Sequence, residues 1–194
     1  AQSALNQQIS GCLSADQLIK YGSTRIVFGK DITNSYPSPS VAENNPTTIL
    51  VKVSHVAARL DFSQFDVTLK GFEGNPTVVF DEAKFVNLQQ NGKIVEGDAS
   101  VNVKDGAFLN RSNRIGTRWT DMGTAYGYAN QYRQDCEMNT ALYVKFTVDG
   151  RTFEKTYPIN PAGITKEVDH NGIKGGYLYD IKVRWTITPD WGDS

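Results

Sequence analysis

The sequence is poor in the side chains on which metal sites and many enzymes depend. Among its 194 residues are only two cysteines, Cys12 and Cys136, and two histidines, His55 and His170. The cysteines lie far apart, and neither belongs to a CxxC pair or has a histidine close by in sequence. A tetrahedral zinc site, which needs four clustered ligands, is therefore not indicated. Free or buried thiols are the favoured interpretation, and a Cys12–Cys136 disulfide in an oxidising compartment stays open.

Catalytic motifs are also missing. The sequence contains no GxSxG, HExxH, P-loop or EF-hand pattern. Asp169 precedes His170, but adjacent residues in a turn are expected to point apart, and no nucleophile is placed beside them. Both histidines are therefore assigned structural roles. Scattered Asp and Glu residues neither exclude nor define a glycosidase pair. We predict that the chain is not an enzyme and uses no cofactor or metal.

The charge balance and the hydrophobic runs narrow the range of partners. The net charge of −1 argues against a general nucleic-acid binder. The group Arg111, Arg114 and Arg118 is interpreted as a solvated loop in preference to an anion site. No apolar run reaches the roughly 18 residues of a membrane span. No signal peptide precedes Ala1, so a cytosolic, mature or trimmed chain is expected.

Alternating apolar and polar residues dominate what is present. A central strand is predicted over Ile49–Phe62, with its apolar face shifting from odd to even numbers near His55, as a β-bulge would cause. The final strand is predicted over 177–188. It has one apolar face, made of Tyr179, Ile181, Val183, Trp185 and Ile187. Other strands are predicted over 24–29, 64–70, 77–80, 83–88, 142–148 and 151–157.

Turn signals separate these strands and indicate a β-sandwich. Asn91-Gly92 and Asp149-Gly150 are predicted hairpin turns. The only helix candidate lies within residues 1–20. Glycines and a proline in Gly71–Pro76 mark the predicted domain boundary, which divides the chain into residues 1–72 and 73–194.

Four aromatic residues between Trp119 and Tyr132 allow two interpretations. Trp119, Tyr126, Tyr128 and Tyr132 could form a platform on which sugars stack. Tyr and Trp are also common strand residues that fill the cores and rims of sandwiches. The second interpretation is favoured, and a carbohydrate-binding β-sandwich is retained as the alternative function.

Four segments, taken in order, resemble a known family. They are VKVSHVAARLDF, VVFDEAKFVNLQQNGKIVEG, AYGYANQY followed by TALYVKFTVDGRTFEKTYPIN, and GGYLYDIKVRWTITPDW. Together they cover about residues 20–194 and resemble the fimbrillins of Bacteroidales, the subunits of type V pili. The resemblance implies two transthyretin-like β-sandwich domains and export as a lipoprotein to an outer-membrane-associated fimbria at the cell surface.

The resemblance also implies how such a subunit assembles. In shaft subunits of the family an N-terminal strand is removed by an arginine-specific protease, and the open edge then receives a strand from a neighbour by β-augmentation. Expected partners are other fimbrial subunits, with host or bacterial surface receptors as further candidates. The expected contact residues are those of the final strand, Tyr179, Ile181, Val183, Trp185 and Ile187.

The sequence departs from the family pattern at both ends. Ala1 leads almost directly into the helix candidate, so the first domain would be incomplete unless a fragment or a neighbour supplies strands. The chain ends three residues after Trp191, which puts a role as strand donor in doubt. An accessory, tip or anchor subunit is therefore favoured over a shaft subunit.

Overall fold

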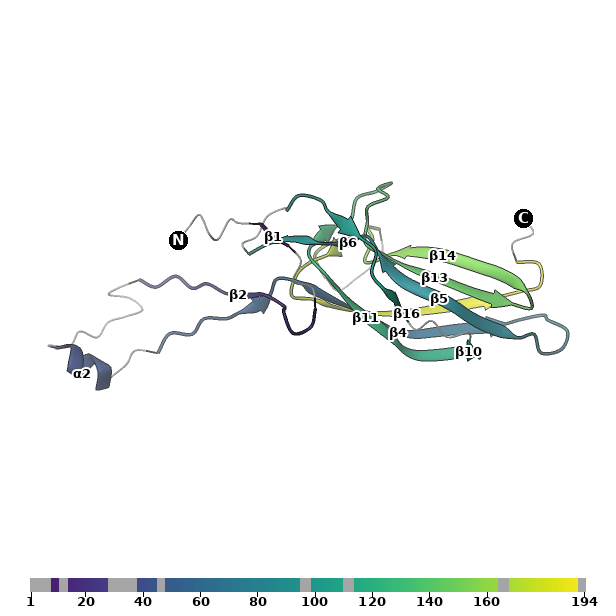
Figure 1. The fold of residues 1–194 in the computed structure, drawn as a ribbon, viewed down its shortest axis with the longest axis horizontal. Coiled ribbons are helices and arrows are strands. Elements are labelled where there is room, and N and C mark those ends of the chain that lie inside the picture. The colour runs from purple at the N-terminus through teal and green to yellow at the C-terminus, as the bar shows by residue number, and fades with distance from the viewer. Residues whose placement is uncertain are drawn as a thin grey trace.

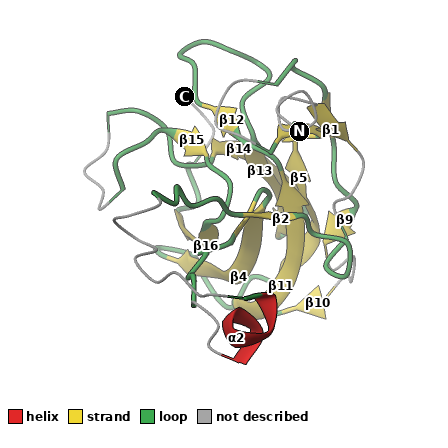
Figure 2. Cartoon of the chain, turned by 90° about the vertical axis from the view of Figure 1, so that its left-hand side faces the viewer, coloured by secondary structure: helices red, strands yellow, loops and turns green. Residues whose placement is uncertain are grey.

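Two packed β-sheets form the body of the protein, and a long arm projects from it (Figure 1). The structure is a computed structural model. It describes residues 8–10, 14–27, 38–44, 48–94, 99–109, 114–163 and 168–191. The view along the long axis shows the two sheets facing each other, with helix α2 at the end of the arm (Figure 2).

The first sheet has the strand order β11–β4–β16. Its strands are β4 (Ala58–Leu69), β11 (Arg118–Gly127) and β16 (Leu178–Ile187). Strand β11 is antiparallel to β4, whereas β16 is parallel to it. Consecutive strands of the chain do not neighbour each other in this sheet. The C-terminal strand β16 pairs with β4 alone and therefore forms one edge of the sheet.

The second sheet is four strands wide. In it β5 (Val78–Val86) pairs with β13 (Ala141–Val148), which pairs with β14 (Arg151–Pro158). The short strands β9 (Phe108–Leu109) and β10 (Arg114–Ile115) share the other edge of β5. Strand β14 is therefore the opposite edge of this sheet.

The remaining elements are short. They are β1 (Gln8–Ser10), β2 (Lys20–Tyr21), α2 (Pro39–Asn44), β3 (Ser54–His55), β6 (Leu88–Gln89), β7 (Asn91–Lys93), β8 (Val103–Lys104), β12 (Asn130–Gln131) and β15 (Gly172–Ile173). They pair as β1–β7, β2–β3, β6–β8 and β12–β15. No helix among the described residues has the length and apolar character needed to cross a membrane.

Strand β4 supplies the centre of the core, and its buried face changes phase along the strand. Ala58, Leu60 and Phe62 are buried, and after the change Phe65 and Val67 are buried. The change falls at residue 63, where the pairing with β16 skips one residue of β4. The bulge predicted near His55 is therefore wrong in position, because β3 ends there and a separate strand begins.

The hairpin β13–β14 confirms the predicted pattern in the C-terminal third. Leu142, Val144, Phe146 and Val148 are buried on β13. Asp149 and Gly150 form the turn with φ angles of 48° and 79°. Positive φ at both turn residues matches the twist of the two strands, and Asp-Gly tolerates it at little cost.

Several local predictions are wrong. Residues 24–27 and 48–53 are not in strands, and Asn91-Gly92 lies within β7 and makes no hairpin turn. Of the helix candidate over residues 1–20, the described parts are a strand at 8–10 and a turn at 14–17. In each case the local sequence shows which residues are polar and which are apolar, but it does not show which strand, if any, pairs with the segment.

The predicted domain boundary lies between β4 and β5. Residues on both sides of it, including Phe65 and Phe80, belong to one hydrophobic core cluster. Their rings lie 5.5 Å apart. The all-β prediction is confirmed, whereas the division into residues 1–72 and 73–194 and the transthyretin-like topology stay predictions.

Candidate assembly edge

The two sheets differ in width, and the difference falls at β14 and β16. Trp119 of β11 contacts Phe80 of β5, with ring centroids 5.8 Å apart. At the other side, Trp185 of β16 contacts Phe146 of β13 at 4.7 Å and Phe153 of β14 at 6.5 Å. The three-stranded sheet therefore ends over β13 and β14, and no described strand beyond β16 covers the inner face of β14.

The backbone of β16 presents a free row of hydrogen-bonding groups. The carbonyls of Tyr177 and Ile187 accept hydrogen bonds from the N–H groups of Arg59 and Lys70 at 3.0 and 2.9 Å. Odd-numbered residues of β16 therefore face β4. Because backbone groups alternate along a strand, those of the even-numbered residues face away from the sheet, and no described strand pairs with them. The outward-facing residues are Leu178, Asp180, Lys182, Arg184 and Thr186.

Strand β14 lines the same side of the sandwich. Its inner face carries Phe153, Lys155 and Tyr157, which are buried, exposed and half-buried, respectively. Lys155 is paired across the hairpin with Val144, which is fully buried. A lysine on the inner face of a sandwich can keep its ammonium in water only where the facing sheet is missing. Here the Nζ of Lys155 lies 5.4 Å from the ring centre of Tyr157. We call this side the β14–β16 edge.

Aromatic rings close one end of the β14–β16 edge. Trp191 stacks near Phe153 and Trp185, at 5.1 and 5.2 Å between ring centroids. The guanidinium of Arg151 donates to the carbonyls of Pro189 and Trp191 at 2.7 and 2.8 Å. The indole Nε1 of Trp185 is buried and makes no hydrogen bond of ordinary geometry. The polar group beside it is the hydroxyl of Tyr157.

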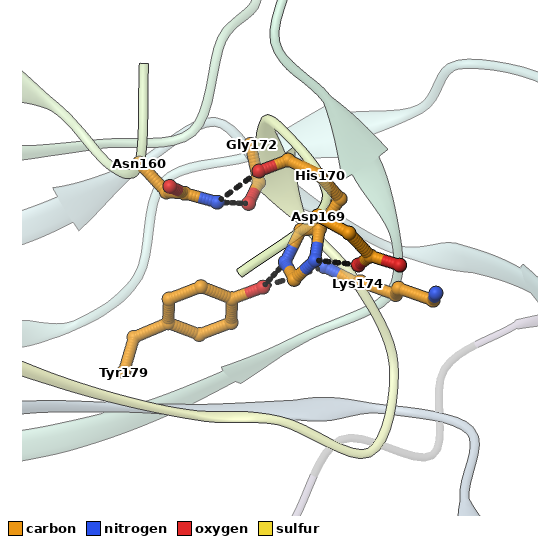
Figure 3. A network of polar contacts seen from close by, with 6 residues as sticks. All are labelled: Asn160, Asp169, His170, Gly172, Lys174 and Tyr179. Atoms are coloured by element: carbon orange, nitrogen blue, oxygen red, sulfur yellow. Dashed lines mark hydrogen bonds and ion pairs between the residues drawn. The ribbon is translucent and has the colours of Figure 1, made fainter. Parts of the chain in front are cut away.

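A polar network fixes the other end of the same edge (Figure 3). The Tyr179 hydroxyl accepts from the N–H of Lys174 at 2.9 Å and lies 2.7 Å from Nε2 of His170. Nδ1 of His170 lies 3.4 Å from Oδ1 of Asp169. The amide of Asn160 donates to the carbonyls of His170 and Gly172. The network anchors the start of β16 to the preceding loop.

The chemistry of this network is consistent with a structural role. The Tyr179 oxygen accepts from the N–H of Lys174 and shares a hydrogen bond with Nε2 of His170, while Nδ1 of His170 faces the Asp169 carboxylate. The hydrogen bond from His170 lowers the pKa of Asp169, and burial raises the pKa of Tyr179. The expectation that Asp169 and His170 point apart is wrong, since the turn brings their side chains together.

The residues predicted for subunit contact all lie on the inner face of β16. Val183, Trp185 and Ile187 are buried in the chain's own core, and Tyr179 and Ile181 are partly buried against it. The predicted alternation is therefore confirmed. Their role in subunit contact stays a prediction, and only Tyr179 and Ile181 keep surface that a neighbour could cover.

The four residues of the alternative glycan site differ in how far they are buried. Trp119 and Tyr128 are buried, whereas Tyr126 and Tyr132 are half-buried. Trp119 packs between Phe65 and Phe80 in the core. Stacking on a sugar requires an exposed ring face, so the four residues do not form one exposed platform. A sugar contact stays a prediction for Tyr126 and Tyr132 alone.

The other predicted polar groups have different outcomes. Arg118 lies on β11 and not in a loop, so that interpretation is wrong for this residue. Arg114 lies on β10, and Arg111 lies outside the described residues. Cys136 is half-buried in a loop, and Cys12 lies outside the described residues, so their pairing stays open. Within the described ranges, no three His, Cys, Asp or Glu residues come together as metal ligands would.

Asp66 is the centre of a charged cluster on the outer face of the first sheet. Its Oδ1 accepts from Nε of Arg118 at 2.9 Å, and its Oδ2 accepts from Gln64 at 2.6 Å. Nε of Arg184 lies 3.6 Å away. The hydrogen bond from Arg118 is the main cause that lowers the pKa of Asp66. The cluster ties β4 to both neighbouring strands.

We expect Asp66→Asn to destabilise the protein modestly and in a pH-dependent way. Because the folded pKa is lowered, the stabilisation is present above the unfolded pKa of about 3.9 and is lost as the pH falls through the folded pKa. The Arg partners are exposed, so the loss at pH 7 is about 1 kcal/mol or less. Urea unfolding at pH 7 and in steps towards pH 3 measures it. A difference from the parent that stays constant with pH contradicts the prediction, and Glu73→Gln in an exposed loop is the control.

The sequence interpretation missed the exposed arm. Residues 20–27 and 48–55 run outward from the sandwich and are joined at their base by the β2–β3 pair (Figure 1). Ile49, Val51 and Val53 were predicted to form a buried face, but they are 43%, 43% and 62% exposed, and Leu50 on the opposite face is 76% exposed. The alternation of apolar and polar residues over 49–53 is the sequence signal of a half-buried strand. No described layer covers this segment, so its apolar residues stay exposed.

Comparison with solved structures finds related folds. A candidate cell adhesion protein from Parabacteroides distasonis is 21% identical, with a TM-score of 0.59, over 70% of this chain and 45% of that chain. A candidate cell adhesion protein from Bacteroides eggerthii is 17% identical, with a TM-score of 0.42, over 77% and 52%. The tip fimbrial protein Mfa3 from Porphyromonas gingivalis, with a C-terminal truncation, is 16% identical, with a TM-score of 0.41, over 84% and 57%.

The first of these likenesses carries the conclusion about fold. Its TM-score places the sandwich of this chain in the same architecture as part of the Parabacteroides distasonis protein. The chain spans about half the length of the solved structures that it matches. A search with protein-family models and a search of curated proteins gave no significant match.

Proposed function

We propose that this chain is an adhesive structural subunit of a surface fimbria, joined to other fimbrial subunits by β-strand addition. The observation that carries the proposal is the backbone row of β16 that no described strand pairs with, beside the part of the inner face of β14 that keeps exposed surface, at Lys155 and Tyr157. A strand added there would pair with the outward groups of β16 and cover Tyr157 and Ile181. Strand addition of this kind gains affinity from main-chain hydrogen bonds and specificity from alternate side chains.

Two other findings support the proposal. The fold likeness is to a protein that is described as a candidate for cell adhesion. The four sequence segments quoted above resemble fimbrillins in order. An accessory, tip or anchor role, attachment at the outer membrane and binding to host or bacterial surface receptors belong to the same proposal. The burial of Trp119 and Tyr128 favours assembly over sugar binding as the principal function.

The proposal is tested by Lys182→Pro. The N–H of Lys182 faces away from β4, so proline at this position removes a donor from the free edge and keeps the ladder to β4. An incoming strand would lose one hydrogen bond and leave an acceptor unpaired, which should weaken assembly by about tenfold or more. Light scattering after size-exclusion chromatography measures the assembly, and circular dichroism verifies the fold.

Lys182→Ala is the matched control, because it removes the same side chain and keeps the backbone donor. It should assemble like the parent. If folded Lys182→Pro protein assembles as well as Lys182→Ala protein, strand addition at β16 is excluded. Binding of the parent to a glycan array, lost in Tyr126→Ala or Tyr132→Ala, would favour the carbohydrate-binding alternative.

A further inference from the structure

We propose that the strand received at β16 is residues 48–53 in the arm of a second copy of this chain. The inference rests on the proposed function and names the donor. It starts from the fact that one chain carries both halves of a complementary pair. One half is an edge with free backbone groups, and the other is an extended apolar segment that no described layer covers (Figure 1).

The donor segment has the pattern of a strand but no sheet to join. Ile49, Val51 and Val53 alternate with Leu50 and Lys52, and β-branched residues suit a strand. Ile49 and Val51 are each 43% exposed and Val53 is 62% exposed. At the base of the arm a Cβ on Gly22 would clash with the carbonyl oxygen of Lys52, so the two sides of the arm lie close together there. The other backbone edge of 48–53 is open to a new partner.

Charge complementarity selects a register. On the outer face of β16, Asp180 is half exposed and its Oδ2 lies 3.4 Å from Nζ of Lys182, while Nε of Arg184 lies 3.6 Å from Oδ2 of Asp66. Residues 48–53 carry a single charge, that of Lys52. Placing Lys52 opposite Asp180 in an antiparallel pair sets Leu50 opposite Lys182 and avoids two facing cations.

The same register matches the inner faces. It places Val53 opposite Tyr179, Val51 opposite Ile181 and Ile49 opposite Val183. Tyr179 and Ile181 are the residues on the inner face of β16 that are only partly buried against the core. In the parallel arrangement with the same charge pair, Ile49 would lie beside residue 177, before β16 begins. The antiparallel pair is therefore the one that uses the whole donor.

Such a contact joins the arm of one copy to the edge of the next. It is head-to-tail, so it leaves an unused edge and an unused arm at the two ends of every oligomer. Each added copy regenerates the same two ends. The arrangement therefore extends into an open series of copies, as in a shaft, so finding it would replace the accessory, tip or anchor part of the proposed function.

The first test compares two faces of the donor. Val51→Asp places a charge on the face that enters the β14–β16 edge, and Leu50→Asp places the same charge on the outer face. Both residues are exposed in the single chain, so both variants should fold. We expect Val51→Asp to lower the association constant at least about tenfold and Leu50→Asp to lower it far less. Sedimentation velocity over a range of full-chain concentrations measures both.

The second test reverses the charge pair. Lys52→Glu and Asp180→Lys, each alone, should weaken association about five- to tenfold, since each leaves like charges facing each other. The double variant should recover most of the loss. A structural role of either side chain would not produce this recovery, because the substitutions lie in different copies at the contact.

The outcomes separate the inference from the proposed function. If Lys182→Pro is monomeric but Val51→Asp assembles like the parent, the donor is another segment or another protein, and this inference is overturned while strand addition stands. If the parent stays monomeric at every concentration, self-donation is overturned. If the double charge variant is weaker than both single variants, the register is overturned.

Discussion

Phe65→Ala is expected to lower the free energy of unfolding by about 3–5 kcal/mol. Phe65 is fully buried in β4. Its ring lies 5.3 to 5.5 Å from the rings of Phe80, Trp119 and Phe146, which belong to three different strands. Alanine would leave a cavity that strands of both sheets would have to collapse to fill. A domain of this kind is stable by only about 5–15 kcal/mol. The loss is a large part of this stability, so the variant should unfold at a much lower temperature than the parent.

Urea unfolding followed by circular dichroism measures this effect. Phe108→Ala is the matched control, since Phe108 lies on the short edge strand β9 and is 39% exposed. The control should lose less than about 1 kcal/mol. If the two variants lose similar amounts, the two sheets do not meet at Phe65, and the core described above is incorrect.

Removal of residues 177–194 is expected to abolish folding. The deletion takes away β16, which contributes Val183, Trp185 and Ile187 to the core. It also removes the ladder that pairs ten residues of β16 with β4. Losing three large buried side chains costs more than the whole stability of a typical domain. The shortened chain should show no cooperative unfolding transition and no near-ultraviolet circular dichroism.

A peptide of residues 177–191 supplied in trans provides the second measurement. Without β16, strand β4 becomes the free edge, and the peptide should restore the fold by adding a parallel strand to it. Recovery of a cooperative transition that depends on peptide concentration is the expected result. A shortened chain that is monomeric, soluble and as stable as the parent would show that β16 is dispensable, and both the core and the assembly edge would then be wrong.

The assembly proposal depends on the outer backbone edge of β16, whereas the stability predictions depend on its inner side chains. The inner side chains of β16 hold the chain's own core, whereas no described strand pairs with the outward backbone groups of Lys182 and its even-numbered neighbours. Substitutions at Trp185 would therefore report folding, and substitutions at Lys182 would report assembly. A sequence-based prediction of contact residues could not make this distinction, because it depends on which edge of the strand is already paired.

Much of the sandwich could be predicted from alternation alone. The pattern of Tyr179 to Ile187 gave the correct face of β16, and Asp149-Gly150 between two alternating runs gave the correct hairpin. Where a strand has a polar and an apolar face, the hydrophobic effect leaves one choice of inside and outside. These elements needed no knowledge of their partners.

The failures occurred where a partner decides the outcome. Asn91-Gly92 has the composition of a tight turn but lies in β7, because β1 from the start of the chain pairs with it. The phase change in β4 falls at residue 63 because β16, more than 100 residues later, skips one residue there. The pairing of β1 with β7 leaves no local sequence signal, whereas the phase change in β4 is visible as the shift from Leu60 and Phe62 to Phe65 and Val67.

The sequence by itself determined that this is an all-β protein and which residues of β13 and β16 face inward. The tertiary structure decided which apolar faces are covered. Ile49 to Val53 have the same alternation as the buried part of β4, yet they are exposed because no described layer lies over them. Alternation states which face prefers burial. Only the arrangement of the sheets determines whether the covering layer comes from the same chain or has to come from another.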